Sequence, residues 1–353
     1  MTIATPDFIA GLPKAELHLH IEGTLTRDLK RKLAARNKID LGEKTFTALE
    51  VSGTAASGSN RAMDQQQLGI AQYKMFLDLY YEGLKVLHTE EDFRDLIFAY
   101  LESCKADNIL YSEIMFDPQA HTDRGVSMGV VMEGLIQGRK DAAEQLGVES
   151  NLIMCINRDR SADSAMQMID DAQPWRDHIA GLGLDSVEDG HPPVKFKDHY
   201  ARAKSEGYRL TAHCDVDMVD AVKHLWQCID VLGVERVDHG INTIEDERLI
   251  AAMKEREMCF TTCPTWRTGD PKPRRVDRIR IMHELGLKVT INTDDPGYFA
   301  SGLMNHMLGP VVTEGQFTKD ELAQFMINAF ESAWLPKETR ERYVGMVRGY
   351  VAS

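Results

Sequence analysis

Cysteine is scarce in this sequence, and its few cysteines form no framework. The chain has 353 residues and six cysteines, with no Cys-x-x-Cys pair; Cys259 and Cys263 stand four positions apart. Secreted domains that depend on disulfides are shorter and far denser in cysteine. We therefore expect reduced thiols and a cytoplasmic protein.

The sequence also has no segment of the kind that directs a chain to a membrane. Residues 1–7 contain neither the basic stretch nor the apolar core of a secretory signal peptide. No uninterrupted apolar run approaches the roughly 20 residues that a transmembrane helix needs. These features predict that no membrane is a partner.

The chain has fewer basic than acidic residues. Lysine and arginine number 41 against 55 acidic residues, which gives a net charge of −14. Such a chain has little affinity for nucleic acids or anionic membranes, although a local basic pocket is compatible with it. The combined His-x-Glu…Pro-Cys-x-x-Cys signature of nucleic-acid deaminases is also absent. We expect a small-molecule partner and no nucleic acid.

Hydrophobic residues are plentiful, at 43% of the chain. Eight short β-rich runs alternate with stretches of helical period, the pattern of a single (β/α)₈ TIM barrel spanning residues 1–353. A doubly wound sheet is the alternative, but no Gly-x-Gly-x-x-Gly follows the first run. The expected strands are Ala15–His20, Ile109–Met115, Asn151–Ile156, Ile179–Leu184, Tyr208–His213, Glu235–His239, Met258–Cys263 and Leu287–Asn292.

The first two expected strands are further apart than one helix requires, which predicts an insertion between them. Residues 51–60 (VSGTAASGSN) have the composition of a loop. Insertions on the loops that follow barrel strands can cover the mouth of the barrel. A lid and a disordered surface loop are the two interpretations.

His18 and His20 carry the strongest chemical signal. They stand two residues apart at the end of the first expected strand, so both side chains should project from one face. Two neighbouring imidazoles form a fork that suits zinc and other late first-row metals. The pair is a candidate metal site if other ligands reach it.

Suitable partners follow later strands: His213, His239, Asp294 and Asp295. The C-terminal ends of barrel strands meet at one face. Three imidazoles and one carboxylate can hold a divalent metal and leave a position for water. A fourth imidazole, that of His239, could orient or deprotonate the water, and Asp295 could take a proton or orient a substrate nitrogen. The alternatives are hydrogen-bonded core histidines and, for the aspartates, a helix cap.

Five segments spread over nearly the whole chain carry a specific pattern. They are LPKAELHLHIEGTL (12–25), FDPQAHTDRG (116–125), GLDSVE (183–188), VDHGIN (237–242) and VTINTDDPGYF (289–299). In these segments the chain resembles the adenosine/adenine deaminase family of metal-dependent amidohydrolases, and most of all its adenine deaminase branch. The resemblance implies one zinc ion per chain, or another divalent transition metal, held by His18, His20, His213 and Asp294.

The resemblance also implies roles for the neighbouring residues. His239 would assist the nucleophilic water, and Asp295 would lie against the substrate. Glu22 stands where nucleoside deaminases use an aspartate near the sugar, and a longer Glu is similar to the branch that takes the free base. Ser186 and Glu188 would contact the edge of the ring.

One departure from the family bears on the substrate. The family's fifth-strand motif is His-Ala-Gly-Glu, whose Glu protonates the ring, whereas this chain has Val216 three residues after His213. Loss of a positioned acid costs on the order of 10²–10⁴-fold in rate. Asp215 or Asp217 could supply the proton, the substrate could need no acid there, or the barrel could be non-catalytic. As loop carboxylates, both aspartates could also be solvated or cap a helix.

The segment after the seventh expected strand departs as well. The family commonly has Cys-Pro-Leu-Ser-Asn, whereas this chain reads CPTWRTGDPKPRR from Cys263. Trp266 could stack on a flat ring or cover the core. Arg267 and the basic residues after it could bind a carboxylate or phosphate, or belong to a solvated loop.

Together these features predict a zinc-dependent hydrolytic deaminase that acts on adenine or a related amino-substituted heterocycle and releases ammonia. The alternatives are a divergent metallohydrolase for another, anionic substrate and a non-catalytic small-molecule-binding protein. A homo-oligomer is compatible with the sequence.

Overall fold

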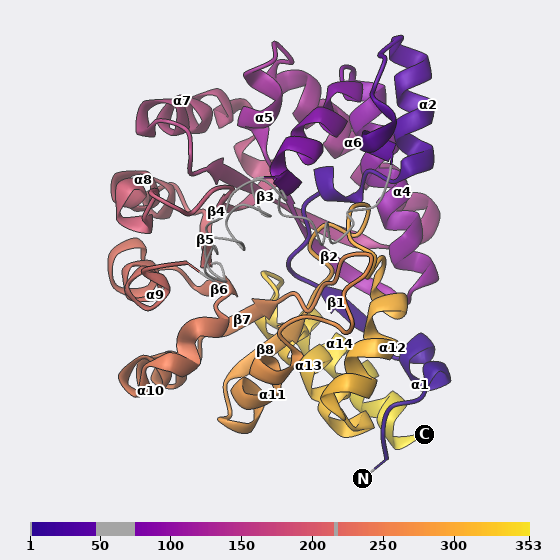
Figure 1. Cartoon of the computed structure of the whole chain (residues 1–353), viewed down its shortest axis with the longest axis vertical. Helices are drawn as coiled ribbons and strands as arrows, with labels where there is room; N and C mark the ends of the chain where they lie inside the picture. The colour runs from indigo at the N-terminus through magenta and orange to yellow at the C-terminus, as the bar shows by residue number, and fades with distance from the viewer. Residues whose placement is uncertain (1, 47–74, 215–217) are drawn as a thin grey trace, which may run out of the picture.

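The protein is a barrel of eight parallel strands surrounded by helices. The computed structural model describes residues 2–46, 75–214 and 218–353, so the expected lid or loop at 51–60 lies outside the described residues. The strands pair in sequence order from β1 to β8, each parallel to the next. Figure 1 shows the helices on the outside of the strands. The predicted (β/α)₈ fold is confirmed.

Seven of the eight strands begin and end within two residues of the predicted bounds. The strands are β1 Lys14–Glu16, β2 Ile109–Phe116, β3 Glu149–Asn157, β4 Ile179–Asp185, β5 Arg209–Cys214, β6 Arg236–His239, β7 Cys259–Thr262 and β8 Lys288–Ile291.

The first strand is shorter than predicted and ends at Glu16, before both histidines. The backbone N–H of Leu17 donates to the side chain of Asn292 at 2.9 Å instead of to a strand. Single bridges then connect Leu19 with Asp294 and His20 with Met115. The first bridge joins the segment after β1 to the segment after β8, and the second joins it to β2, so the segment that carries the histidines also closes the barrel.

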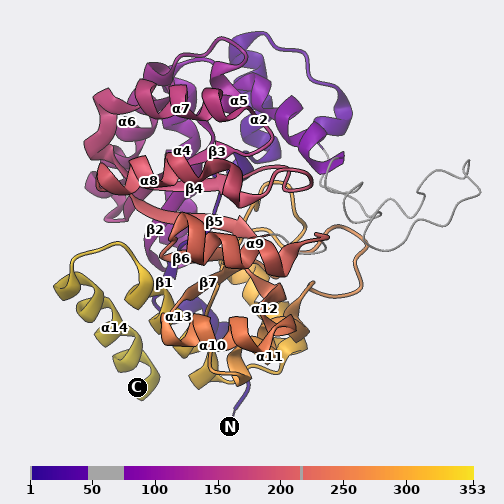
Figure 2. The same ribbon diagram turned by 90° about the vertical axis from the view of Figure 1, so that its left-hand side faces the viewer.

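The helices cover the outside of the barrel, and α7 to α10 lie side by side along it (Figures 1 and 2). None of the helices in the described ranges combines the length and apolar character of a membrane span. The α-helices are α1 Pro6–Gly11, α2 Arg27–Asn37, α4 Glu90–Ala106, α5 Pro118–Thr122, α6 Met128–Leu146, α7 Ala162–Asp171, α8 Lys197–Ser205, α9 Ala221–Gln227, α10 Glu247–Glu255, α11 Val276–Glu284, α12 Met304–Gly315, α13 Lys319–Ser332 and α14 Lys337–Ala352.

Residues 17–108 separate β1 from β2 and contain the predicted insertion, including α2, helical residues 75–83 and α4. Short helices complete the chain: η1 Glu22–Thr24, η2 Glu43–Phe46, η3 Leu84–Val86, η4 Gln173–His178, η5 Pro193–Phe196, the π-helix η6 Cys228–Leu232 and η7 Ile241–Glu245.

A buried ion pair and a tryptophan close the barrel at the N-terminal end of its strands. Arg236 Nη1 lies 2.6 Å from Glu113 Oε2, and both residues are buried. The guanidinium stacks over the ring of Trp334, 4.3 Å from its centre. This packing leaves the C-terminal ends of the strands as the face that holds the polar side chains described next.

Candidate active site

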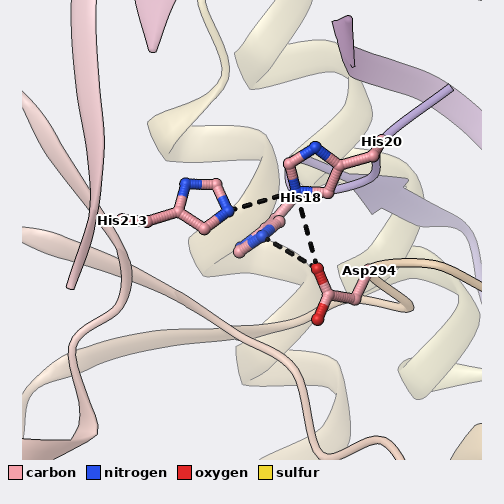
Figure 3. Close-up of side chains that lie close together, drawn as sticks. All are labelled: His18, His20, His213 and Asp294. Carbon is pink, nitrogen blue, oxygen red and sulfur yellow. Dashed lines mark hydrogen bonds and ion pairs between the residues drawn. The ribbon is translucent and has the colours of Figure 1, made fainter. Parts of the chain in front are cut away.

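Four polar side chains meet at the C-terminal ends of the strands. His18 and His20 follow β1, His213 lies in β5 and Asp294 follows β8. Figure 3 shows them directed toward one another, and one ligand atom of each lies within 4.8 Å of the others. His20 Nε2 is 3.1 Å from His213 Nε2, and Asp294 Oδ1 is 3.3 Å from His18 Nε2 and 3.7 Å from His20 Nε2.

The type and spacing of these donors fit a divalent transition metal. Zinc holds nitrogen and oxygen ligands at about 2.0–2.2 Å, which places the ligand atoms of a tetrahedral site roughly 3.3–3.6 Å apart. All four residues are buried. A shared cation would stabilise two buried imidazole nitrogens that face each other beside a carboxylate. The cluster is therefore a candidate metal centre.

Asp238 and Thr261 orient the histidines from behind. His18 Nδ1 lies 2.9 Å from the carbonyl oxygen of Thr261 and donates to it, which directs the lone pair of Nε2 into the cluster. Asp238 Oδ2 lies 3.5 Å from His213 Nδ1. The hydroxyls of Thr211 and Thr261 each donate to Asp238 at 2.7 Å. Partners of this kind fix the tautomer and direction of metal-binding histidines.

Asp238 and Thr261 were not among the site residues expected from the sequence. Each is a polar residue inside a buried strand, where its neighbours Val237 and Phe260 are apolar. A polar side chain that points into a barrel needs a partner there. That signal is available in the sequence once the strands are assigned.

The charges within the cluster are strongly coupled. Burial lowers the pKa of His18, but the hydrogen bond and charge of Asp294 outweigh it and leave that pKa above its usual value. Burial raises the pKa of Asp294, and His18 more than reverses the effect. Burial and then the charge of His18 hold the pKa of His213 and of His239 well below the ordinary histidine value. His239 is therefore an uncharged imidazole at neutral pH.

His239 and Asp295 line the same cavity as the cluster. His239 ends β6, and Asp295 follows Asp294 after β8. A side chain at Gly23 would lie 2.0 Å from Asp295 Oδ1, so glycine is needed at that position for the close approach. Both of these predicted catalytic residues stand beside the candidate metal ligands.

The backbone has positive φ angles at three strand ends that supply residues to the site. Ser186, His239 and Asp294 have φ values of 67°, 60° and 64°. This left-handed region is unfavourable for residues other than glycine and persists where the surrounding structure enforces it. All three line the cavity, so the strained turns aim these side chains at one space.

The cavity enclosed by these residues measures about 1020 Å³, including its opening to solvent. Three of the predicted substrate-binding residues, Ser186, Trp266 and Arg267, contribute to its wall. The Ser186 hydroxyl also lies 3.0 Å from that of Tyr81. Aromatic side chains that could stack on a flat ring line the cavity as well, namely Phe76, Tyr80, Tyr81, Trp266 and Phe299.

A pair of buried carboxyls forms another part of the wall. The side-chain amide of Asn157 donates to Asp117 and Asp185 at 3.1 and 3.3 Å. Burial, followed for Asp185 by the charge of Asp117, raises the pKa of both carboxyls. Asp185 Oδ2 lies 3.5 Å from His20 Nδ1. Both aspartates belong to segments that carry the family resemblance, but neither was expected to be a site residue.

Glu22, one of the predicted substrate-binding residues, is not among the described residues that line the cavity. Its carboxylate lies 2.8 Å from His121 Nε2 and accepts the backbone N–H of Asp117 at 3.1 Å. Burial raises the pKa of Glu22 to about 7 and lowers that of His121 to about 3. The contact with His121 is thus a buried hydrogen bond in which the imidazole is uncharged at neutral pH.

Glu188 is likewise not in the cavity wall. It is fully buried, 2.5 Å from His224 Nδ1 and 3.4 Å from Arg158 Nη1. Arg158 also donates to the carbonyl oxygen of His213 at 3.0 Å. Glu188 therefore supports the strand end that carries His213, because it pairs with the arginine that donates to His213.

Asp215, Val216 and Asp217 lie outside the described residues, so the predicted proton donors have no structural placement. Two described residues near this gap, His213 before it and Met218 after it, line the cavity.

The fold and the cluster define a barrel enzyme with a candidate metal centre at the C-terminal ends of its strands. The adenosine deaminase family model matches residues 13–349. An adenine deaminase of Vibrio parahaemolyticus is 39% identical over 347 residues, 98% of each chain. The chain therefore belongs to the adenosine deaminase family and is a hydrolytic deaminase.

Solved structures agree with this assignment. The crystal structure of an adenine deaminase from Arthrobacter aurescens superimposes with a TM-score of 0.82 at 32% identity, covering 97% of this chain and all of the other. A zinc-bound amidohydrolase of Burkholderia ambifaria gives a TM-score of 0.79 at 26% identity, covering 100% of this chain and 96% of the other.

Proposed function

We propose that this protein is a zinc-dependent hydrolytic deaminase of adenine or a closely related amino-substituted heterocycle. The reaction consumes one water, replaces the ring amino group with an oxo group and releases ammonia. The convergence of His18, His20, His213 and Asp294 in one cavity with His239 and Asp295 carries the proposal. The adenine deaminases among the similar proteins and the zinc-bound neighbour support the choice of substrate and metal.

In this proposal the four clustered residues hold the zinc ion, which when bound supplies a water molecule of lowered pKa as the nucleophile. His239 accepts a proton from the attacking water, a role that its uncharged, buried imidazole fits. Asp295 accepts a hydrogen bond from the substrate amino group and holds it in line for departure. The aromatic wall stacks on the ring and excludes water from its faces.

The ring nitrogen must also gain a proton as water adds, and Val216 has no proton to donate. We propose that Asp215 or Asp217 supplies it. Replacing the responsible aspartate with Asn should lower kcat by at least 100-fold and leave the metal content unchanged. Full activity in both single variants would reject this assignment.

The function is tested by measuring bound metal and ammonia release together. Purified protein should contain about one zinc per chain and release ammonia from adenine or from another member of a panel of aminopurines, pterins and triazines. His213→Ala should lose both metal and activity, whereas His178→Asn, a change at an exposed histidine, should lose neither. Stoichiometric zinc without turnover of any amine would refute the deaminase function.

A further inference from the structure

We propose that the natural substrate carries an anionic group, a carboxylate or a phosphate, and that Arg267 and Arg275 bind this group at the wall of the cavity. The inference rests on the deaminase function proposed above and names its substrate class. The two arginines lie in the segment that joins β7 to α11.

This segment brings three guanidinium groups to the same cavity as the candidate metal ligands. Arg267, Arg274 and Arg275 line it together with His20, His213 and Asp294. The chain as a whole is strongly acidic, with a net charge of −14. A concentration of positive charge in this wall is therefore a local feature and does not reflect the overall composition.

Arg274 serves to hold the segment in place. Its Nε and Nη2 atoms donate to the two carboxylate oxygens of Asp270 at 2.8 and 3.0 Å. Asp270 also accepts the backbone N–H of Arg267 at 2.8 Å, and the backbone N–H of Arg274 donates to Thr265 at 3.3 Å. Asp270 thus compensates the charge of Arg274 and fixes the turn from which Arg267 projects.

Arg267 is buried, with 9% of its surface exposed. Burial, followed by the charge of Arg274, lowers its pKa to about 10. A buried guanidinium is costly unless anionic groups surround it. Its five N–H donors can serve a protein partner and a ligand at once, so the proposal does not require Arg267 to be unpartnered.

Arg275 is held at the cavity by an unusual backbone conformation. Its φ of 66° lies in the left-handed region, directly before the first residue of α11. Its neighbour Arg278 pairs with Glu245 at 2.6 Å, whereas Arg275 forms no ion pair with any carboxylate of residues 2–46, 75–214 and 218–353. Arg275 therefore offers a cationic group to whatever occupies the cavity.

The cavity wall contains both acidic and basic side chains. Asp117, Asp185, Asp294 and Asp295 line it, as do the three arginines from the segment after β7. The aspartates can accept hydrogen bonds from a substrate amino group. The guanidinium groups can bind an oxyanion through paired hydrogen bonds, which depend on both its charge and its shape. Adenine has no anionic group at neutral pH and would leave the arginines without a ligand.

The test compares matched substrates that differ by one anionic group. The pairs are 9-(carboxymethyl)adenine with 9-methyladenine, pterin-6-carboxylate with pterin, and adenosine 5′-monophosphate with adenosine. We expect kcat/KM for the anionic member of at least one pair to exceed that of its neutral partner by roughly 10- to 100-fold, the effect of one or two charge-assisted hydrogen bonds. The pair that shows the preference distinguishes carboxylate from phosphate, and the preference should weaken as salt is added.

Substitutions then assign the preference to the arginines. Arg275→Gln and Arg267→Gln should bring the anionic-to-neutral ratio close to one. Arg275 is only partly buried, so its variant tests the inference even if Arg267→Gln fails to fold. Arg278→Gln, in the first turn of α11 and outside this cavity wall, is the matched control and should keep the ratio.

The inference is overturned if no anionic member exceeds its neutral partner, or if the preference survives in Arg275→Gln. If neither adenine nor any panel member releases ammonia, the proposed deaminase function itself has failed. The two failures are therefore distinguishable.

Discussion

Replacing Asp238 with Asn should weaken metal binding although Asp238 is not a candidate metal ligand. Asp238 is fully buried in β6 and paired in register with His213 of β5. It faces His213 Nδ1 at 3.5 Å and accepts hydroxyl hydrogen bonds from Thr211 and Thr261. Asparagine keeps the size of the side chain but removes its charge and puts N–H donors where two hydroxyls already donate.

The expected loss follows from what Asp238 does for His213. A carboxylate behind a metal-binding imidazole raises its basicity and fixes its direction, and loss of such a partner costs about 10- to 100-fold in metal affinity. This corresponds to about 1.4–2.8 kcal/mol. The histidine itself remains, so the site should still bind metal when zinc is in excess.

Zinc affinity is measured by competition with a chromophoric chelator, with circular dichroism to verify the fold. Asp177→Asn, a change at an exposed aspartate, is the control and should bind zinc like the unaltered protein. A folded Asp238→Asn protein whose zinc affinity lies within twofold of the control would refute the orienting role of Asp238.

Three further predictions concern stability. Removing zinc with a chelator should lower Tm, since a ligand at 1,000 times its Kd adds about 4 kcal/mol to the folded state; an unchanged Tm after verified metal loss would contradict this. Glu113→Gln should reduce the free energy of unfolding by about 3–5 kcal/mol because Arg236 loses its closest partner. The double variant Glu113→Leu with Arg236→Met should recover most of this lost stability, as measured by urea unfolding. A loss in the double variant equal to that of Glu113→Gln would contradict this account of the ion pair. Burial lowers the pKa of Lys30 from 10.5 to about 8, so the folded chain binds fewer protons than the unfolded chain between these values. The stability of the unaltered protein should rise relative to Lys30→Met by up to about 3 kcal/mol from pH 8 to 10.5, and parallel pH profiles would rule this out.

The fold was predictable because its signals are local. A buried parallel strand is a short apolar run, and its ends are marked by the polar residues that follow. The strand Ile179–Asp185 was therefore expected from Ile179 to Leu184, one residue short. The first strand was misjudged because a side chain, that of Asn292, replaces its backbone partner. No pattern within residues 14–20 reports a partner that lies some 270 residues away.

The site was predictable only as far as strand ends determine it. His213 and Asp294 come together because the C-terminal ends of all barrel strands share one face. The direction of a side chain beyond its strand depends on partners elsewhere in the chain. Glu188 turns inward to Arg158 and His224, and nothing near Glu188 in the sequence announces either partner.

The two departures from the family motifs both fall outside the candidate metal ligands. Val216 follows β5 and Arg267 follows β7, and these strands lie on either side of β6, which carries His239. The candidate metal ligands also require β1 and β8, which retain the family pattern. In the proposed mechanism the candidate metal ligands and His239 activate the water, and neither departure replaces one of these residues. We therefore expect the same hydrolysis of a ring amino group, on a substrate that also carries the anionic group proposed for Arg267 and Arg275.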